Sequence, residues 1–344
     1  ALDKVSPLVA ERIVYEEKRR ILEPYLRHDD WGYQGFIWAK DPAHRGRVNN
    51  WNPWINANVL VTAALTARDP ALRARVIHKT MESLDNFMIP YPLDGGSDEG
   101  PEYWEKAAGS VLDYLETLKG VTAGRIDVVS RPILRKMGEY IYKTPINGSY
   151  YFNYGDCDAR LYPDPALLYR FGRDTRDTLL MHFGAAQAVR QDLKSQPLTQ
   201  PFGILNRGLA QLMLLAALSK ATPVPPLERD VWFDKLQIMA ARSRGGSSEG
   251  FYLGVKGGTN GESHNHNDVG SFIVYVDGKP ALVDAGAQTY TRETFSKARY
   301  ELWNNQSSYH NLPDINGYPE QAGSAYRATG VDYTMNDRSA TLTM

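Results

Sequence analysis

The sequence predicts a multidomain α+β protein, with an (α/α) toroid of helical hairpins followed by an antiparallel β-sandwich domain. Three observations support this fold class. Apolar residues recur at helical spacing through the first two-thirds of the chain. Prolines at 223, 225 and 226 then interrupt the pattern, as in a linker. Beyond them, apolar residues alternate around the dipeptide Asp277-Gly278, which is a strong hairpin signal.

The helical pattern recurs in segments separated by loops rich in Trp, Tyr, Gly, Asn and Pro. The segments span residues 7–26, 56–67, 71–87, 103–118, 128–142, 176–188 and 204–218. Helices of middle length, with polar and aromatic residues pooled in the connecting loops, are typical of an α/α array. We therefore place the toroid at residues 1–225.

Strand-like alternation begins near Val231. The segment SFIVYVDGKPALVDAG predicts a hairpin, and YRATGVDYTMNDRSATLTM predicts a further strand–turn–strand unit. About a hundred residues is thin for a β-sandwich. We therefore predict a β-sandwich domain at residues 231–344 and expect it to be the start of a larger one, in a fragment or a reduced form of a longer protein.

Composition narrows the function. With 42% hydrophobic and 23% charged residues, the chain is typical of a soluble globular protein. Its net charge of −1 gives no overall attraction to polyanions, so local basic groups would have to hold an acidic ligand. The single cysteine, Cys157, excludes an internal disulfide. No signal peptide is visible, although a leader could already be missing. We expect no membrane span and no nucleotide or nucleic-acid binding, because the required patterns are missing.

The sharpest motif is GESHNHNDVGSF, residues 261–272. His264 and His266 alternate, so on a strand their side chains would share a face. Asp284 follows at the end of the predicted hairpin, and His310 lies further on, in SSYHNLPDING. Two histidines and a carboxylate are a common zinc set. The alternative is a group of hydrogen-bonded polar residues at a domain junction.

Three motifs in the helical part could serve a sugar ligand or the fold itself. DGGSDEGPEYW holds Glu99, which could cap a helix, and Trp104. NGSYYFNYGDCDAR holds a tyrosine cluster beside Asn153, Asp156 and Arg160, and its rings could equally lie in the core. NNWNPWINAN offers amides and two Trp rings, with helix capping as the simpler reading.

These strings resemble the heparinase II/III-like polysaccharide lyases. KGGTNGESHNHNDVGSFIVYVDGKPALVDAG and SSYHNLPDING carry the most specific resemblance, and DGGSDEGPEYW, NWNPW and YFNYGD extend it from about residue 49 to residue 317. The family joins an (α/α) toroid to an antiparallel β-sandwich. Members cleave uronate-containing acidic glycans, such as heparin, heparan sulfate or alginate, by β-elimination.

The resemblance also implies roles for single residues. His264 would be catalytic or would neutralise the substrate carboxylate, and Tyr151, or else Tyr154, would transfer the proton. Glu99 matches a glutamate of some members. The implied metal ligands, which would hold a divalent and structural ion such as Zn²⁺, are His266, Asp284 and His310. The residues expected to bind substrate are Asn52, Trp104, Asn153, Arg160 and Tyr290.

The expected partner is an acidic polysaccharide or oligosaccharide, and the resemblance implies a periplasmic or secreted location. The sequence leaves the oligomeric state open. Two other functions compete with the lyase: a glycoside hydrolase that uses paired carboxylates, such as Asp98 or Glu99 with Asp156, and a glycan-binding protein without activity.

A tyrosine that acts as a base would need a nearby cation to lower its pKa, and Arg160 is the expected cation.

Overall fold

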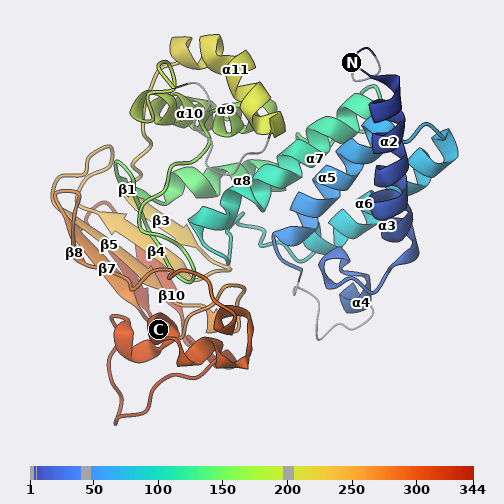
Figure 1. The fold of residues 1–344 in the computed structure, drawn as a ribbon. Coiled ribbons are helices and arrows are strands. Elements are labelled where there is room, and N and C mark those ends of the chain that lie inside the picture. Colours follow the sequence, from blue (N-terminus) through green and yellow to red (C-terminus); the bar gives the residue numbers. More distant parts are fainter. Residues whose placement is uncertain (1–3, 5, 40–47, 197–204) are drawn as a thin grey trace. The chain divides into compact units, whose positions relative to one another are not determined.

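The computed structural model describes residues 4, 6–39, 48–196 and 205–344. The chain forms two compact units, one of residues 1–91 and 106–129, the other of residues 92–105 and 130–344. Apart from one short ladder at residues 145–151, helices come first and antiparallel strands follow from Asp230, as Figure 1 shows by colour, which confirms the predicted order of elements. The second unit combines helices with all of these strands. The division into domains 1–225 and 231–344 therefore remains a prediction.

The first unit is helical. Its main elements are α2 (Pro7–Glu17), a π-helical turn (Lys18–Leu22), α3 (Glu23–Arg27), α4 (Phe36–Ala39), α5 (Trp51–Thr66), α6 (Pro70–Met88) and α7 (Ala108–Val121). Asp69 caps α6 by accepting from the Ala71 amide, with Pro70 at the first helical position. Leu22, Tyr25, Val59, Ala63 and Val76 belong to one buried cluster of this unit.

The helices of the second unit are α8 (Pro132–Lys143), α9 (Pro165–Thr175), α10 (Thr178–Arg190) and α11 (Leu205–Lys220), after a short 3-10 helix (Pro101–Glu105). The sequence analysis missed α9, although its start signal is present. Asp164 accepts hydrogen bonds from the first amides of α9, and Pro165 follows it. Gly172 allows α9 to approach α10, since a Cβ there would lie 2.7 Å from the Asp177 carbonyl oxygen.

Five antiparallel strands form the main sheet, in the order β3 (Asp230–Phe233), β4 (Ile238–Arg242), β5 (Phe251–Lys256), β7 (Phe272–Val276) and β8 (Lys279–Leu282). The predicted hairpin is β7–β8, and its turn residues Asp277 and Gly278 have φ values of 51° and 70°. Three two-stranded ladders complete the β-structure: β1 (Pro145–Asn147) with β2 (Tyr150–Tyr151), β6 (Thr259–Asn260) with β9 (Gly323–Arg327), and β10 (Asp332–Met335) with β11 (Ala340–Thr343).

Strand β3 carries layers on both faces. Phe233 is buried against Tyr140 of α8, with ring centroids 5.1 Å apart. Trp232 points to the opposite face, because successive side chains alternate, and stacks on Tyr333 of the β10–β11 hairpin at 4.8 Å. The sheet is therefore covered by a helix on one side and a short hairpin on the other.

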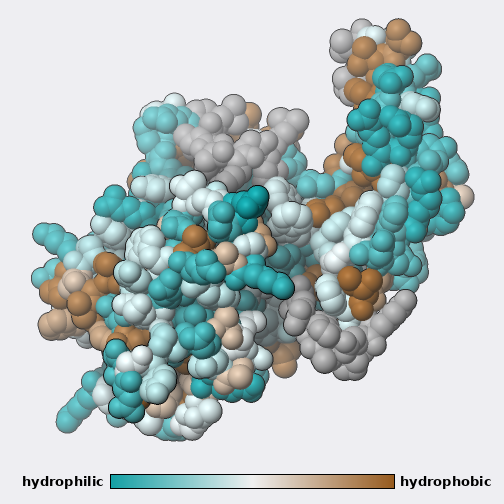
Figure 2. All heavy atoms as spheres, turned by 60° about the horizontal axis from the view of Figure 1, so that its bottom comes forward, coloured by the Kyte–Doolittle hydropathy of each residue, from teal (hydrophilic) through white to brown (hydrophobic). Residues whose placement is uncertain are grey.

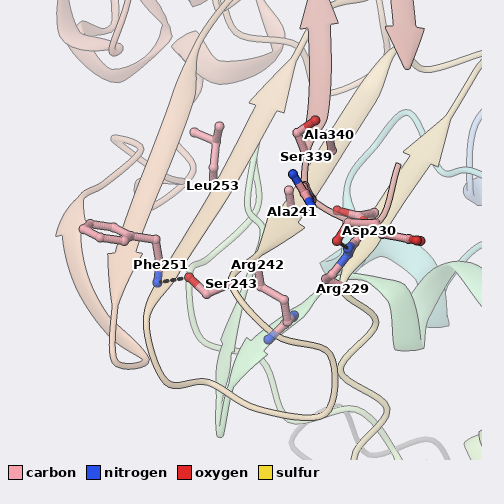
Figure 3. Close-up of a pocket in the computed structure, with 11 residues that line it drawn as sticks. Arg229, Asp230, Ala241, Arg242, Ser243, Phe251, Leu253, Ser339 and Ala340 are labelled. Carbon is pink, nitrogen blue, oxygen red and sulfur yellow. Dashed lines mark hydrogen bonds and ion pairs between the residues drawn. The ribbon is translucent and has the colours of Figure 1, made fainter. Parts of the chain in front are cut away.

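A hollow marks the seam between this hairpin and the sheet (Figure 3). Arg229 donates to the carbonyl oxygens of Asn336 and Asp337, and it also pairs with Asp230. Arg242 donates to the carbonyl oxygen of Pro145 at 2.7 Å, among other main-chain carbonyls. Both guanidinium groups thus bind the chain itself, and the hollow is a structural seam.

The strand-rich unit presents a mostly hydrophilic face in Figure 2, where apolar side chains form small separate patches. None of the helices that the structure describes is long and apolar enough to cross a membrane.

Candidate active site

The HNHND segment is a loop, which corrects the expectation that it is a strand. β6 ends at Asn260 and β7 begins at Phe272, with turns and irregular backbone between them. His264 has φ = 52°, in the left-handed region that residues with a Cβ rarely adopt. Alternation on one strand therefore does not explain how His264 and His266 come to lie close together. Both histidines contact the same third residue, and this contact brings them together.

That residue is Asp156, from the tyrosine-rich loop. One carboxylate oxygen, Oδ2, lies 2.9 Å from Nδ1 of His264. The other, Oδ1, lies 2.9 Å from Nε2 of His266 and accepts from Arg299 at 2.9 Å. The Tyr290 hydroxyl also donates to Oδ2, at 3.1 Å. Burial alone would raise the pKa of Asp156, but hydrogen bonds from the two histidines and the charge of Arg299 outweigh it and hold the pKa well below its usual range.

His264 is flanked on its other sides by residues of the 92–105 segment. Its Nε2 lies 3.6 Å from a carboxylate oxygen of Glu99. Its ring stacks on Tyr103, with centroids 4.1 Å apart. The side chain keeps about 10% of its surface exposed, whereas Glu99 and Asp156 keep 3% each. His264 is thus a partly accessible imidazole between two buried carboxylates.

Tyr290 adds a hydroxyl to this group. Its oxygen lies 3.2 Å from Nδ1 of His264 and also forms a hydrogen bond with the Tyr103 hydroxyl. Burial, the Tyr103 hydrogen bond and the charge of Asp156 raise the pKa of Tyr290 far above its usual value. Tyr290 is 41% exposed and lies next to His264 with a protonated hydroxyl, so it is a candidate proton donor. The sequence analysis expected Tyr290 to bind substrate, and that role remains a prediction.

Gly155 explains how the loop reaches His264. Its φ is 56°, and a Cβ at this position would lie only 2.6 Å from the His264 carbonyl oxygen. The next residue, Asp156, donates its amide to that same oxygen at 3.1 Å. The YFNYGD string thus places a glycine where two loops touch and an aspartate where it can bind both histidines.

The predicted metal ligands also come together. One ligand atom each from His266, Asp284 and His310 lies within 4.8 Å of the others, and all three residues are buried. In the part of the chain that the structure describes, Nδ1 of His266 and Nε2 of His310 are buried without a hydrogen-bond partner. Unpaired buried imidazole nitrogens beside a carboxylate are costly unless they bind an ion. The residues therefore fit a zinc-type ion.

The two predicted proton-transferring tyrosines lie in the core. Tyr151 is fully buried, and its hydroxyl accepts from Gln187 at 3.3 Å. Tyr154 is 2% exposed, and its hydroxyl donates to the Ser97 carbonyl oxygen at 2.7 Å. Burial raises the pKa of both hydroxyls. Of the three tyrosines Tyr151, Tyr154 and Tyr290, Tyr290 is the one whose hydroxyl contacts His264.

The expected cation for these tyrosines is also corrected. Arg160 donates to the Tyr150 hydroxyl at 2.6 Å, with its guanidinium over that ring. The positive charge that acts on Tyr151 is Arg190. Adjacent numbers did not mean adjacent side chains, because Tyr150 and Tyr151 point in opposite directions from β2.

Three expected substrate contacts are corrected as well, because the fold uses these side chains itself. Trp104 is fully buried and donates Nε1–H to the Met137 carbonyl oxygen at 2.7 Å. Asn153 is buried and donates to the Cys157 carbonyl oxygen at 3.3 Å. Asn52, in the other compact unit, is fully buried and donates to the Tyr33 carbonyl oxygen at 2.8 Å.

A second buried charge cluster lies next to this loop. Lys256 pairs with Asp268 at 2.7 Å and with Glu262 at 3.3 Å. Burial raises the pKa of Glu262 to about 7. The positive charge of Lys256 lowers this pKa, whereas the negative charges of Asp98 and Asp268 raise it further. Folded Glu262 therefore holds its proton more tightly than the unfolded chain does, and stability should fall as pH rises from 4.5 to 7.

Glu262→Gln is thus expected to stabilise the protein at pH 8, where the native carboxylate is charged, by on the order of 1–3 kcal/mol. It should have little effect at pH 5, where native Glu262 is already neutral. Urea unfolding at the two pH values measures the difference. Glu301→Gln, at an exposed position, is the matched control and should change stability equally at both. A Glu262→Gln effect independent of pH would contradict the assignment.

Comparison with known proteins shows which proteins this chain is similar to. Residues 226–322 match the family model described as heparinase II/III-like, C-terminal. The structure is similar to a heparinase III, the BT4657 gene product, with 17% identity and a TM-score of 0.55, covering 89% of this chain and 43% of that one. A second heparinase III structure gives 15% identity, a TM-score of 0.51, and coverage of 85% and 42%.

No curated protein sequence matches the chain. The resemblance noted in the sequence is confirmed: residues 226–322 match the heparinase II/III-like C-terminal model, and the fold matches part of the helical toroid and β-sandwich of the heparinase III structures. The chain spans less than half the length of these structures.

Proposed function

We propose that this protein is a polysaccharide lyase that cleaves uronate-containing acidic glycans, of the heparin, heparan sulfate or alginate type, by β-elimination. The observation that carries the proposal is the position of a partly accessible histidine, His264, next to the Tyr290 hydroxyl, whose oxygen lies 3.2 Å from Nδ1 of the ring. A base and a proton donor side by side are what a syn elimination requires. The resemblance also favours a periplasmic or secreted location.

In this mechanism His264 is the base. Its Nδ1–H is directed to Asp156, which leaves the Nε2 lone pair free to take the proton from C5 of the uronate. The electrons of the C5–H bond form the C4–C5 double bond, and the bond from C4 to the glycosidic oxygen breaks. The Tyr290 hydroxyl donates its proton to that leaving oxygen. Arg299 donates to Asp156 and to the main-chain carbonyl oxygens of Asn265 and Thr294, and so holds the carboxylate that orients His264.

A zinc-type ion would be held by His266, Asp284 and His310, and would serve to cross-link the loops on which these residues lie. His264 is two residues from one ligand, so a fixed His266 also limits the movement of His264. The substrate would contact the residues around His264 and would not bind to the metal ion.

The direct test incubates the protein with heparin, heparan sulfate, chondroitin, hyaluronan and alginate, and follows ultraviolet absorbance. Elimination creates an unsaturated uronate that absorbs ultraviolet light, whereas hydrolysis creates no absorbing product. We expect such a product from at least one uronate glycan. Binding of these glycans without any product would support a glycan-binding protein instead.

Tyr290→Phe tests the choice of tyrosine. It removes one accessible hydroxyl and little volume, so the fold should persist while turnover falls by about a hundredfold, the usual scale for a general acid. Tyr151→Phe and Tyr154→Phe are the matched controls, and both should keep most of their activity. Full activity in Tyr290→Phe, with a large loss in either control, would return the role to the tyrosine that the family resemblance favours.

A further inference from the structure

A single carboxylate connects the proposed base to the proposed metal ligands. Asp156 uses Oδ2 for His264 and Oδ1 for His266, at 2.9 Å each. The two histidines do not share a strand, and no hydrogen bond between their rings is present among the described residues. Asp156 therefore connects the two side chains directly, in addition to the short stretch of backbone between the two histidines.

The contacts also fix the tautomer of each ring. A carboxylate accepts hydrogen bonds, so Nδ1 of His264 and Nε2 of His266 must both carry a proton. Nε2 of His264 is then left as the base nitrogen. Nδ1 of His266, which is buried without a partner, is left to bind a metal ion. The two rings thus have opposite tautomers, set by the same side chain.

Backbone geometry adds a second constraint. His264 has φ = 52°, a conformation that is unfavourable for a residue with a Cβ. The Asp156 amide holds this conformation by donating to the His264 carbonyl oxygen at 3.1 Å. Asp156 therefore binds His264 through both its main chain and its side chain.

From these contacts we infer that Asp156 is a positioning residue which sets His264 for proton transfer and His266 for metal binding at the same time. The inference deepens the proposed lyase function and rests on it for the catalytic part. The metal part stands on the geometry of His266 alone. Arg299 supports the arrangement by donating to Oδ1 of Asp156 at 2.9 Å.

Asp156→Asn is the informative change. Asparagine keeps the main-chain bond and the side-chain shape, but one oxygen becomes an NH₂ group, which cannot accept from a histidine N–H. One of the two rings must then turn or change tautomer. We expect the affinity for Zn²⁺ to fall by about 10- to 100-fold, and kcat to fall by about 10- to 100-fold with KM near the wild-type value. Asp158→Asn, an exposed carboxylate in the same loop, should leave both unchanged.

Zinc affinity is measured by titrating Zn²⁺ into chelator-treated protein, with a competing dye, and does not depend on activity. If Asp156→Asn binds Zn²⁺ as tightly as wild type, or keeps its kcat, the inference is overturned. If the wild-type protein makes no unsaturated product, the lyase proposal fails, and the zinc titration alone decides the inference. If circular dichroism shows that Asp156→Asn does not fold, Arg299→Gln is the deciding variant, because it keeps Asp156. It should lower the affinity for Zn²⁺ and kcat by a smaller factor than Asp156→Asn. No change in either quantity would overturn the inference.

Discussion

Replacing His264 by alanine is expected to reduce lyase turnover by about 10²- to 10⁴-fold, the range for loss of a general base. The protein should keep its fold and its metal ion. The change removes a ring that stacks on Tyr103 and a hydrogen bond to Asp156, but it leaves the predicted metal ligands in place. Turnover on the best glycan, metal content and melting temperature are the three measurements.

His264→Asn is the companion variant, because asparagine tolerates the left-handed backbone of this position better than other residues with a Cβ. It should be as inactive as His264→Ala and melt close to wild type. Normal turnover in either variant would remove the central residue of the mechanism. Equal loss of metal in His264→Ala and in a true ligand variant would make His264 a ligand.

His266→Ala should behave in the opposite way and lose metal and stability together. It removes one of three buried ligands and leaves His310 and Asp284 without the full set. A bound ion stabilises the fold by about 3–4 kcal/mol when its concentration is a hundred to a thousand times its dissociation constant. We therefore expect a clear fall in melting temperature and a loss of the bound ion by metal analysis.

Added zinc separates this effect from simple loss of packing. After treatment with a chelator, wild-type protein should regain its melting temperature with Zn²⁺, whereas His266→Ala should not respond. His182→Ala, which removes a histidine of α10, is the matched control and should keep the response to zinc. Wild-type protein that is free of metal and indifferent to zinc would exclude the metal site.

The parts of the fold with local signals could be predicted from the sequence. The Asp277-Gly278 turn fixes the β7–β8 hairpin, because both residues adopt positive φ. Most long helices were also placed within a few residues, from their apolar spacing. Helix α9 was missed despite Asp164-Pro165 at its start, a capping signal that apolar periodicity does not weigh.

The candidate site was only partly predictable. The grouping of the predicted metal ligands could be expected, because His266, Asp284 and His310 lie in motifs with a specific family resemblance. The partners of His264 could not, because Asp156 and Arg299 are far from it in sequence and reach it through tertiary packing. The sequence analysis named Asp156 only as one carboxylate of the alternative hydrolase pair. Gly155 before it marks a close approach of two loops.

Burial decided which tyrosines can act. Tyr151 and Tyr290 carry the same phenol, and Tyr151 lies in a sequence motif rich in other polar residues. The structure buries Tyr151 against Gln187 and leaves Tyr290 accessible beside His264. Which aromatic residues of a cluster face solvent depends on how the strands and helices pack, and a single sequence carries little of that information.

The most direct test of elimination at His264 is the mass of the products from a defined uronate oligosaccharide, measured for wild-type protein and for His264→Asn. We expect the two wild-type products to add up to the mass of the substrate, one of them to carry the ultraviolet-absorbing double bond, and His264→Asn to form neither. Products that together exceed the substrate by one water would show hydrolysis and contradict elimination.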